Sequence, residues 1–261
     1  MYGYCYSAYN RLAFLGGIDS NASAFFAATG ITDPTIQSAI DTLCVDLKKY
    51  GVFDKMKAIY PFVGGTATTH KFNLVNPLDT DAAFRLAFNG GWTHSSNGAL
   101  PNGTNAYADT FLVANGNLGL NSTHVSAYSR TDIAKTAPII ANQIGGAANE
   151  TSLWLKDVTT LYLRVNNPLI STLSNTNSTG YYIGNRNSST QIALFKNNIK
   201  TTFTQNSNSL SSSSFRLANG GVFYDNKQIA FSTIGDGLTD TEASNLYIAV
   251  QKFQTTLGRQ V

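Results

Sequence analysis

Short runs of alternating apolar and polar residues fill most of the chain after residue 66. Segments 107–115, 123–130 and 228–234 place apolar side chains at every second position, the spacing of a strand with one buried face. Sequences rich in Gly, Asn and Ser separate such runs, among them NGG at 89–91 and the stretch 206–214. Many short strands with turns of this kind predict a mainly β chain, folded as an antiparallel β-sandwich or jelly roll.

Helical spacing is confined to the two ends of the chain. In segment 33–51, Asp33 is placed to cap a helix, Pro34 takes its first position and Gly51 ends it. Its apolar stripe consists of Ile36, Ile40, Leu43, Leu47 and Tyr50. Segment 52–65 predicts a further short turn of helix, with Met56 and Ile59 facing inward.

The last 33 residues predict a strand followed by a helix. In the strand, Ile229, Phe231 and Thr233 share one face, and Ala230, Ser232 and Ile234 share the other. Thr239 and Glu242 have the spacing of a capping box, and Gly258 is the expected stop of the helix. We therefore divide the chain into an N-terminal helical and assembly segment, 1–65, and a jelly-roll domain with a C-terminal helix, 66–261.

The composition narrows the classes of partner. Only 13% of the 261 residues are charged and the formal net charge is +3, so the surface is rich in hydroxyls and amides. No stripe of Lys and Arg is available to neutralise phosphates, which argues against nucleic acid as a partner. No stretch is long and apolar enough to predict insertion into a membrane.

Two blocks of the sequence are similar to known families. The segments YYIGNRN (181–187), QIALFKNN (191–198) and QIAFSTIGDGLTDTEASNLY (228–247) resemble the C-terminal part of concanavalin A-like, or laminin-G-like, jelly rolls. The block 47–110 resembles bacteriophage virion structural proteins, either tail-fibre-like or minor particle proteins.

The phage resemblance implies a non-enzymatic structural component of a virion, assembled in the cytoplasm of a bacterial host. A surface position, as in a tail fibre or capsid appendage, implies homo-oligomers, contacts with other virion proteins and possible binding to a host-surface glycan. Tyr2, Tyr4, Tyr6 and Tyr9 suit an interface, because tyrosine buries a large ring while its hydroxyl stays wet. We expect residues 1–30 to dock on another chain.

Catalytic chemistry has little support in the sequence. The competing function is a polysaccharide-degrading enzyme of the concanavalin-like class, which needs two carboxylates about 5–5.5 Å apart if it retains configuration. The chain has only two Glu residues, Glu150 and Glu242, and the closely spaced Asp79 and Asp81 lie in an expected turn. The histidines lack the spacing of a metal site. We predict no catalytic residues and no enzyme activity.

Binding fits the residues better than catalysis does. Glycan sites combine an aromatic platform with amide and hydroxyl groups, because sugars offer apolar C–H faces and many hydroxyls. One turn-rich stretch supplies such a set: Trp92, His94, Asn102, Asn105 and Tyr107. Asn105 and Asp109 have the oxygen ligands that Ca²⁺ prefers, and no other cofactor is expected. Two alternatives stay open: a core position for Trp92, and a purely architectural protein without a ligand.

Overall fold

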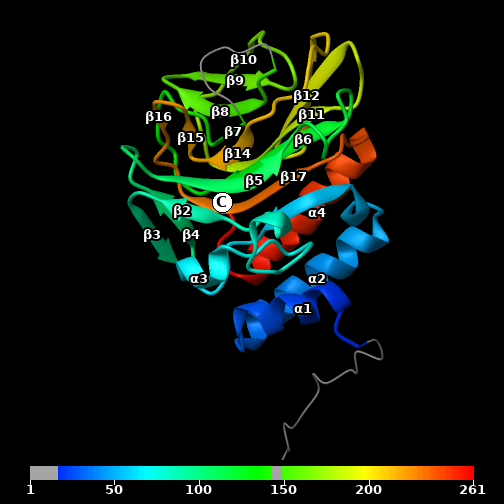
Figure 1. Cartoon of the computed structure of the whole chain (residues 1–261), viewed down its shortest axis with the longest axis vertical. Coiled ribbons are helices and arrows are strands. Elements are labelled where there is room, and N and C mark those ends of the chain that lie inside the picture. Colours follow the sequence, from blue (N-terminus) through cyan, green and yellow to red (C-terminus); the bar gives the residue numbers. More distant parts are fainter. Residues whose placement is uncertain (1–16, 143–148) are drawn as a thin grey trace, which may run out of the picture.

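A computed structural model describes residues 17–142 and 149–261, which form two antiparallel sheets packed face to face and a layer of helices against one of them. In Figure 1 the helices gather below the sheets. The predicted antiparallel β-sandwich with helices near both ends is confirmed. The resemblance to phage proteins concerns origin and is not addressed by this architecture.

The larger sheet has eight strands in the described residues. They follow the order β13-β12-β11-β6-β17-β4-β3, and β1 pairs with β17 beside β4. The strands are β1 (Met56–Tyr60), β3 (Trp92–Ser95), β4 (Gly98–Pro101), β6 (Thr123–Ser129), β11 (Gly180–Arg186), β12 (Gln191–Lys196), β13 (Ile199–Thr204) and β17 (Ile229–Gly235).

The smaller sheet has seven strands in the described residues, in the order β10-β9-β8-β7-β14-β5-β2. A separate hairpin, β15–β16, follows β14. These strands are β2 (Ala87–Asn89), β5 (Tyr107–Val113), β7 (Ile140–Ala141), β8 (Ser152–Asp157), β9 (Thr160–Arg164), β10 (Ser171–Ser174), β14 (Ser214–Leu217), β15 (Asn219–Gly220) and β16 (Phe223–Tyr224).

Two hydrophobic cores hold the three layers together. The core between the sheets contains residues from both, such as Leu112, Phe215 and Ile234. The second core lies between the larger sheet and the helices, where Phe231 meets Phe253. The helices are α1 (Ser20–Thr29), α2 (Pro34–Lys49), α3 (Ala67–His70) and α4 (Asp240–Thr256), with 3₁₀ turns η1 (Phe53–Lys55) and η2 (Asp81–Ala83).

The expected helix ends are confirmed. Asp33 Oδ1 accepts hydrogen bonds from the backbone N–H groups of Thr35 and Ile36 at the start of α2. Thr239 and Glu242 form the reciprocal capping box of α4. Helix α1 lies within the N-terminal helical segment 1–65, although the sequence pattern did not locate this particular helix. Of the segment 1–30 expected to dock on another chain, residues 1–16 lie outside the described residues, and α1 packs on α2 of its own chain.

Segment 52–65 differs from the prediction. A single 3₁₀ turn at η1 leads into strand β1, so Met56 and Ile59 lie on a strand and not on a helix. Strand β1 pairs with β17, which extends the larger sheet to a part of the chain before residue 65. The division into segments 1–65 and 66–261 stays a prediction, although the first strand of the sandwich precedes it.

Strand β17 is buried on both faces, and its alternation is interrupted. Ile229 belongs to the core between the sheets, whereas Phe231 belongs to the core under the helices. The register with β6 shifts between these two residues, which is the mark of a β-bulge. The expectation that Ile229 and Phe231 share one face was therefore wrong, because one extra residue reverses the side on which the following residues lie.

Candidate functional site

Trp92 lies on strand β3 and is half-buried against the core between the sheets. Its indole N–H donates to the carbonyl oxygens of Asn89, at 3.0 Å, and Tyr107, at 3.3 Å. The ring packs edge-on against Phe88, with the ring centres 5.2 Å apart. These contacts give Trp92 a structural role at the sandwich edge. Its predicted contact with a glycan stays a prediction.

Replacing Trp92 with alanine should lower the free energy of unfolding by about 3 kcal/mol, since the change removes a large ring and leaves the Asn89 carbonyl without that donor. Urea denaturation followed by circular dichroism measures this. A loss below about 1 kcal/mol would contradict a packing role.

His94, also on β3, is joined to His70 of α3. Their Nδ1 atoms lie 2.9 Å apart, so one ring donates a hydrogen bond to the other. His70 is fully buried, and burial together with His94 lowers its pKa to about 3. Burial also lowers the pKa of His94. Both rings are therefore neutral at pH 7 and connect α3 to the sheet edge.

The two predicted asparagines shape their own loop. Asn102 Oδ1 accepts hydrogen bonds from the backbone N–H groups of Thr104, Asn105 and Ala106. Asn102 Nδ2 donates to Asn105 Oδ1 at 2.8 Å, and that oxygen also accepts from the Gly91 N–H. The amide groups that were expected to meet a sugar thus hold the loop between β4 and β5.

Tyr107 and Asp109 project from β5 onto the outer face of the smaller sheet. The Arg216 guanidinium lies 4.8 Å from the centre of the Tyr107 ring, and its Nε is 3.3 Å from Asp109 Oδ2. In the described part of the chain, no three acidic, His or Cys side chains are grouped as metal ligands. The calcium site at Asn105 and Asp109 stays a prediction, and the Asp109 carboxylate already has a cationic partner.

The same outer face carries aromatic residues that the sequence interpretation did not select. Trp154 of β8 and Tyr162 of β9 are cross-strand partners, with ring centres 6.1 Å apart and nearly perpendicular planes. Phe223 of the β15–β16 hairpin lies 5.4 Å from Trp154 and is 39% exposed. With Tyr107 these residues form what we call the aromatic row: Tyr107, Phe223, Trp154 and Tyr162.

Strand register places the row across the sheet. Cross-strand pairs run in a line through Asp109, Arg216, Ala141, Ser152 and Arg164. Three residues of the row lie two positions along their own strands from that line, all on the same side of it: Tyr107, Trp154 and Tyr162. The path from β5 to β9 crosses four strand spacings of about 4.8 Å, so the row extends over about 19 Å.

The sequence did contain a signal for this row. In β8 and β9 the inward positions are leucines, all fully buried: Leu153, Leu155, Leu161 and Leu163. The alternate positions, which face solvent, hold Trp154 and Tyr162 where polar residues are usual. Large aromatic side chains on the outward face of a sheet are the informative exception to burial.

Polar groups beside the row are mostly paired with one another. The Tyr162 hydroxyl donates to Asp157 Oδ2 at 3.3 Å, and burial, reinforced by the Asp157 charge, raises the pKa of Tyr162. Arg164 Nη1 is 3.0 Å from Glu150 Oε1. Arg164 and Arg216 therefore each have a carboxylate partner, and the face offers rings and hydrogen-bonding groups with little unbalanced charge.

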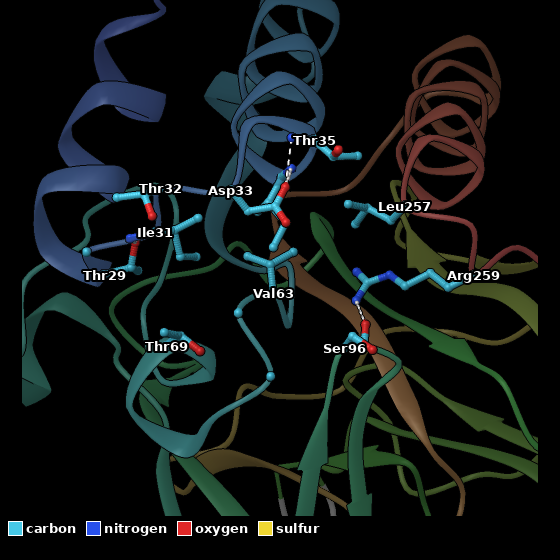
Figure 2. A pocket seen from close by; sticks show the side chains of 14 residues that line it. Thr29, Ile31, Thr32, Asp33, Thr35, Val63, Thr69, Ser96, Leu257 and Arg259 are labelled. Carbon is cyan, nitrogen blue, oxygen red and sulfur yellow. Dashed lines mark hydrogen bonds between the residues drawn. The ribbon is translucent and has the colours of Figure 1, made fainter.

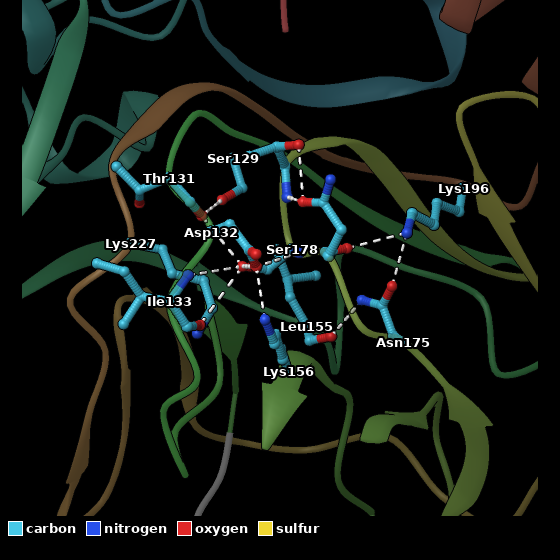
Figure 3. A network of polar contacts seen from close by, with 12 residues as sticks. Ser129, Thr131, Asp132, Ile133, Leu155, Lys156, Asn175, Ser178, Lys196 and Lys227 are labelled. Atoms are coloured by element: carbon cyan, nitrogen blue, oxygen red, sulfur yellow. Dashed lines mark hydrogen bonds and ion pairs between the residues drawn. The ribbon is translucent and has the colours of Figure 1, made fainter. Parts of the chain in front are cut away.

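Ser178 lies beside the Asp132 carboxylate, which also binds Lys156 (Figure 3). The Ser178 hydroxyl is buried, donates to the Thr131 carbonyl at 3.0 Å and accepts from the Ile133 N–H at 3.1 Å. Lys156 donates to Asp132 Oδ1 at 2.8 Å. This hydrogen bond and a second one from the backbone N–H of Ser178 lower the pKa of Asp132. The serine ties the segment after β6 to the start of β11, which is a structural role.

The carboxylates considered from the sequence are also engaged. Glu150 pairs with Arg164, and Glu242 caps α4. Asp79, on an exposed loop, has its Oδ1 3.7 Å from Arg85 Nε. Asp81, on η2, has its Oδ1 2.7 Å from Arg85 Nη2. No helix in the described ranges has the length and apolarity to cross a bilayer.

Comparison with known proteins identifies a fold and no family. No family model matches the chain, and no curated protein is similar to it. A Trypanosoma rangeli sialidase in complex with 2,3-difluoro-KDN has a TM-score of 0.54 at 10% identity, covering 82% of this chain and 39% of the sialidase. The chain thus spans about two fifths of that protein. At this identity the likeness shows the fold alone.

Two further solved structures are less similar. The binding domain of botulinum neurotoxin serotype D has a TM-score of 0.49 at 12% identity, covering 75% of this chain and 52% of that one. Domain 4 of the arabinanase AbnA from Geobacillus stearothermophilus, with arabinotriose, has a TM-score of 0.42 at 14% identity, covering 74% and 98%. Nothing in these likenesses bears on a virion origin.

Proposed function

We propose that the protein is a non-enzymatic glycan-binding module and that the aromatic row is its binding surface. The observation that supports this is the line of Tyr107, Phe223, Trp154 and Tyr162 on the solvent-facing side of the smaller sheet. Aromatic faces stack on the C–H faces of sugar rings, and hydroxyl and amide groups at the margins bind sugar hydroxyls. No catalytic role is proposed.

The geometry favours an extended and neutral polysaccharide. A row of about 19 Å accommodates several sugar rings laid across the strands. Because Arg164 and Arg216 are already paired with Glu150 and Asp109, an acidic sugar would gain a cationic partner only by breaking an existing ion pair. A neutral chain meets no such penalty.

The place of this module in a phage particle is a proposal from the sequence resemblance. In that setting, binding to a host-surface glycan would come from homo-oligomers, since many copies convert weak single contacts into high avidity. Contacts with other virion proteins and localisation to the virion belong to the same proposal. Electron microscopy of purified particles with a labelled antibody tests it, and absence from the particles would overturn it.

Trp154→Ala should weaken binding to a neutral polysaccharide about five- to twelvefold, because one lost stacking contact removes about 1–1.5 kcal/mol of binding free energy. Affinity electrophoresis in gels containing neutral polysaccharides, such as arabinan, glucan and mannan, measures the change. Tyr247→Ala is the matched control: it removes a half-buried aromatic ring from α4, in the helical layer.

The control should be retarded as strongly as the unmodified chain. If no polysaccharide retards the unmodified chain, or if Trp154→Ala is retarded equally, the aromatic row is not the binding surface. Retardation only in gels of acidic polysaccharide would contradict the preference for a neutral chain.

A further inference from the structure

A pocket of about 610 Å³ lies in the helical half of the molecule, away from the aromatic row. Its walls come from the connection between α1 and α2, the connection between β1 and α3, the β3–β4 turn and the end of the chain after α4. Figure 2 shows Asp33 at the start of α2 and Arg259 approaching from the opposite side. The volume is that of a small-molecule site.

The lining combines hydroxyl groups with an apolar wall. The hydroxyls belong to Thr29, Thr32, Thr35, Thr69 and Ser96. The apolar part consists of Ile31, Ile36, Val63 and Leu257. Hydroxyls both donate and accept hydrogen bonds, so this lining suits a ligand that presents both kinds of group beside a C–H face.

The two charged residues of the lining are engaged within the protein. Arg259 is 1% exposed, and each of its N–H groups donates to a neutral oxygen, four of them backbone carbonyls. Asp33 Oδ1 caps α2, and its carboxylate stands at the exposed rim. One positive and one negative group leave the pocket without net charge. An anionic ligand would lose hydration there without gaining a free cationic partner, because the N–H groups of Arg259 are all engaged.

We propose that this pocket binds a neutral, hydroxyl-rich molecule of the size of a single sugar ring. The hydroxyls of Thr32, Thr35 and Ser96 bind those of the ligand, and the apolar wall covers its C–H face. The site is separate from the aromatic row, on the other side of the larger sheet, and it does not depend on glycan binding there.

Saturation-transfer NMR with glucose, galactose and N-acetylglucosamine tests the proposal, with gluconate and glucosamine as charged probes. Thr32→Trp fills the pocket from its exposed rim and should reduce the affinity for the neutral sugar at least tenfold. Ala24→Trp adds the same ring on an exposed position of α1 that does not line the pocket, and it should bind as the unmodified chain does.

A second variant makes a smaller change to the pocket and is less liable to misfold. Thr35→Val removes one lining hydroxyl with nearly the same volume and should weaken binding severalfold, while thermal melting shows that each variant is folded. Trp154→Ala should leave the signal intact, which separates this site from the aromatic row. The proposal fails if no neutral sugar gives a signal, if the signal survives Thr32→Trp, or if only the charged probes bind.

Discussion

Replacing Arg259 with methionine should lower the free energy of unfolding by about 4 kcal/mol. The guanidinium joins four parts of the chain: it donates to the carbonyls of Pro61 and Phe62 at 2.6 and 2.7 Å, to those of Ser96 and Ala230, and to Gln254 Oε1. Methionine fills much of the volume but donates no hydrogen bond. Several buried carbonyl oxygens would then lack a partner, at about 1–3 kcal/mol each before relaxation.

Urea denaturation at pH 7 measures this loss, and Lys252→Met is the matched control. Lys252 lies on the exposed side of α4 and pairs with Asp46 at 2.7 Å, so its replacement should change the free energy of unfolding by less than about 1 kcal/mol. Arg259→Lys keeps the charge but offers fewer donors, and we expect an intermediate loss. An Arg259→Met variant within 1 kcal/mol of the unmodified chain would show that these hydrogen bonds do not hold the end of the chain.

The helix boundaries and the class of fold were predictable because their signals are local. Asp33 before Pro34, and Thr239 before Glu242, satisfy the first N–H groups of a helix whatever packs around them. Strand alternation in β5 likewise depends only on one buried face. Both kinds of feature can be identified from a few neighbouring residues.

The site was less predictable because side chains adjacent in sequence diverge onto different sheets. Trp92 and His94 lie on β3, at the edge of the larger sheet, and Trp92 packs against the core between the sheets. Tyr107 lies on the smaller sheet and faces solvent. The aromatic row instead gathers Tyr107 with Trp154, which is 47 positions later. Only the strand order places β5 and β8 in one sheet.

The burial of polar residues was also not predictable from the sequence. Arg259 is third from the end of the sequence given and has no local pattern to mark it, yet it is 1% exposed. Its position follows from the docking of α4 on the larger sheet, which brings the residue to the Pro61 carbonyl. The bulge at Ala230 is similar: the alternation appears regular until pairing with β6 requires an extra residue.

Lowering the pH from 7 to 5 should reduce the free energy of unfolding by about 2 kcal/mol through His124 alone. This ring is fully buried, and burial lowers its pKa to about 4. Its Nδ1–H donates to the Asp236 carbonyl at 2.6 Å, and Nε2 accepts from the Thr233 hydroxyl at 3.0 Å. That hydroxyl is in turn 2.6 Å from Ser126 Oγ, to which Tyr181 donates.

The sign follows from the two states. A histidine in the unfolded chain has a pKa near 6.5, so below that pH the unfolded state binds a proton that the folded state does not bind. The contribution of His124 to the free energy of unfolding is therefore fully present above about pH 7. It is lost as the pH falls from 6.5 to the folded pKa of about 4. His70, with a pKa lowered to about 3, adds a comparable loss in the same range.

Urea denaturation at pH 7, 6 and 5 measures the slope, and His124→Gln is the informative variant. Glutamine can donate to the Asp236 carbonyl but does not titrate, so the pH-dependent loss should fall by about half while His70 still contributes. NMR titration of the ring protons checks the cause directly, because neither His124 nor His70 should change shift above pH 5 in the folded protein. A free energy of unfolding that stays constant from pH 7 to 5, or a His124 ring that titrates near 6.5, would show that the buried chain of hydrogen bonds tolerates the proton.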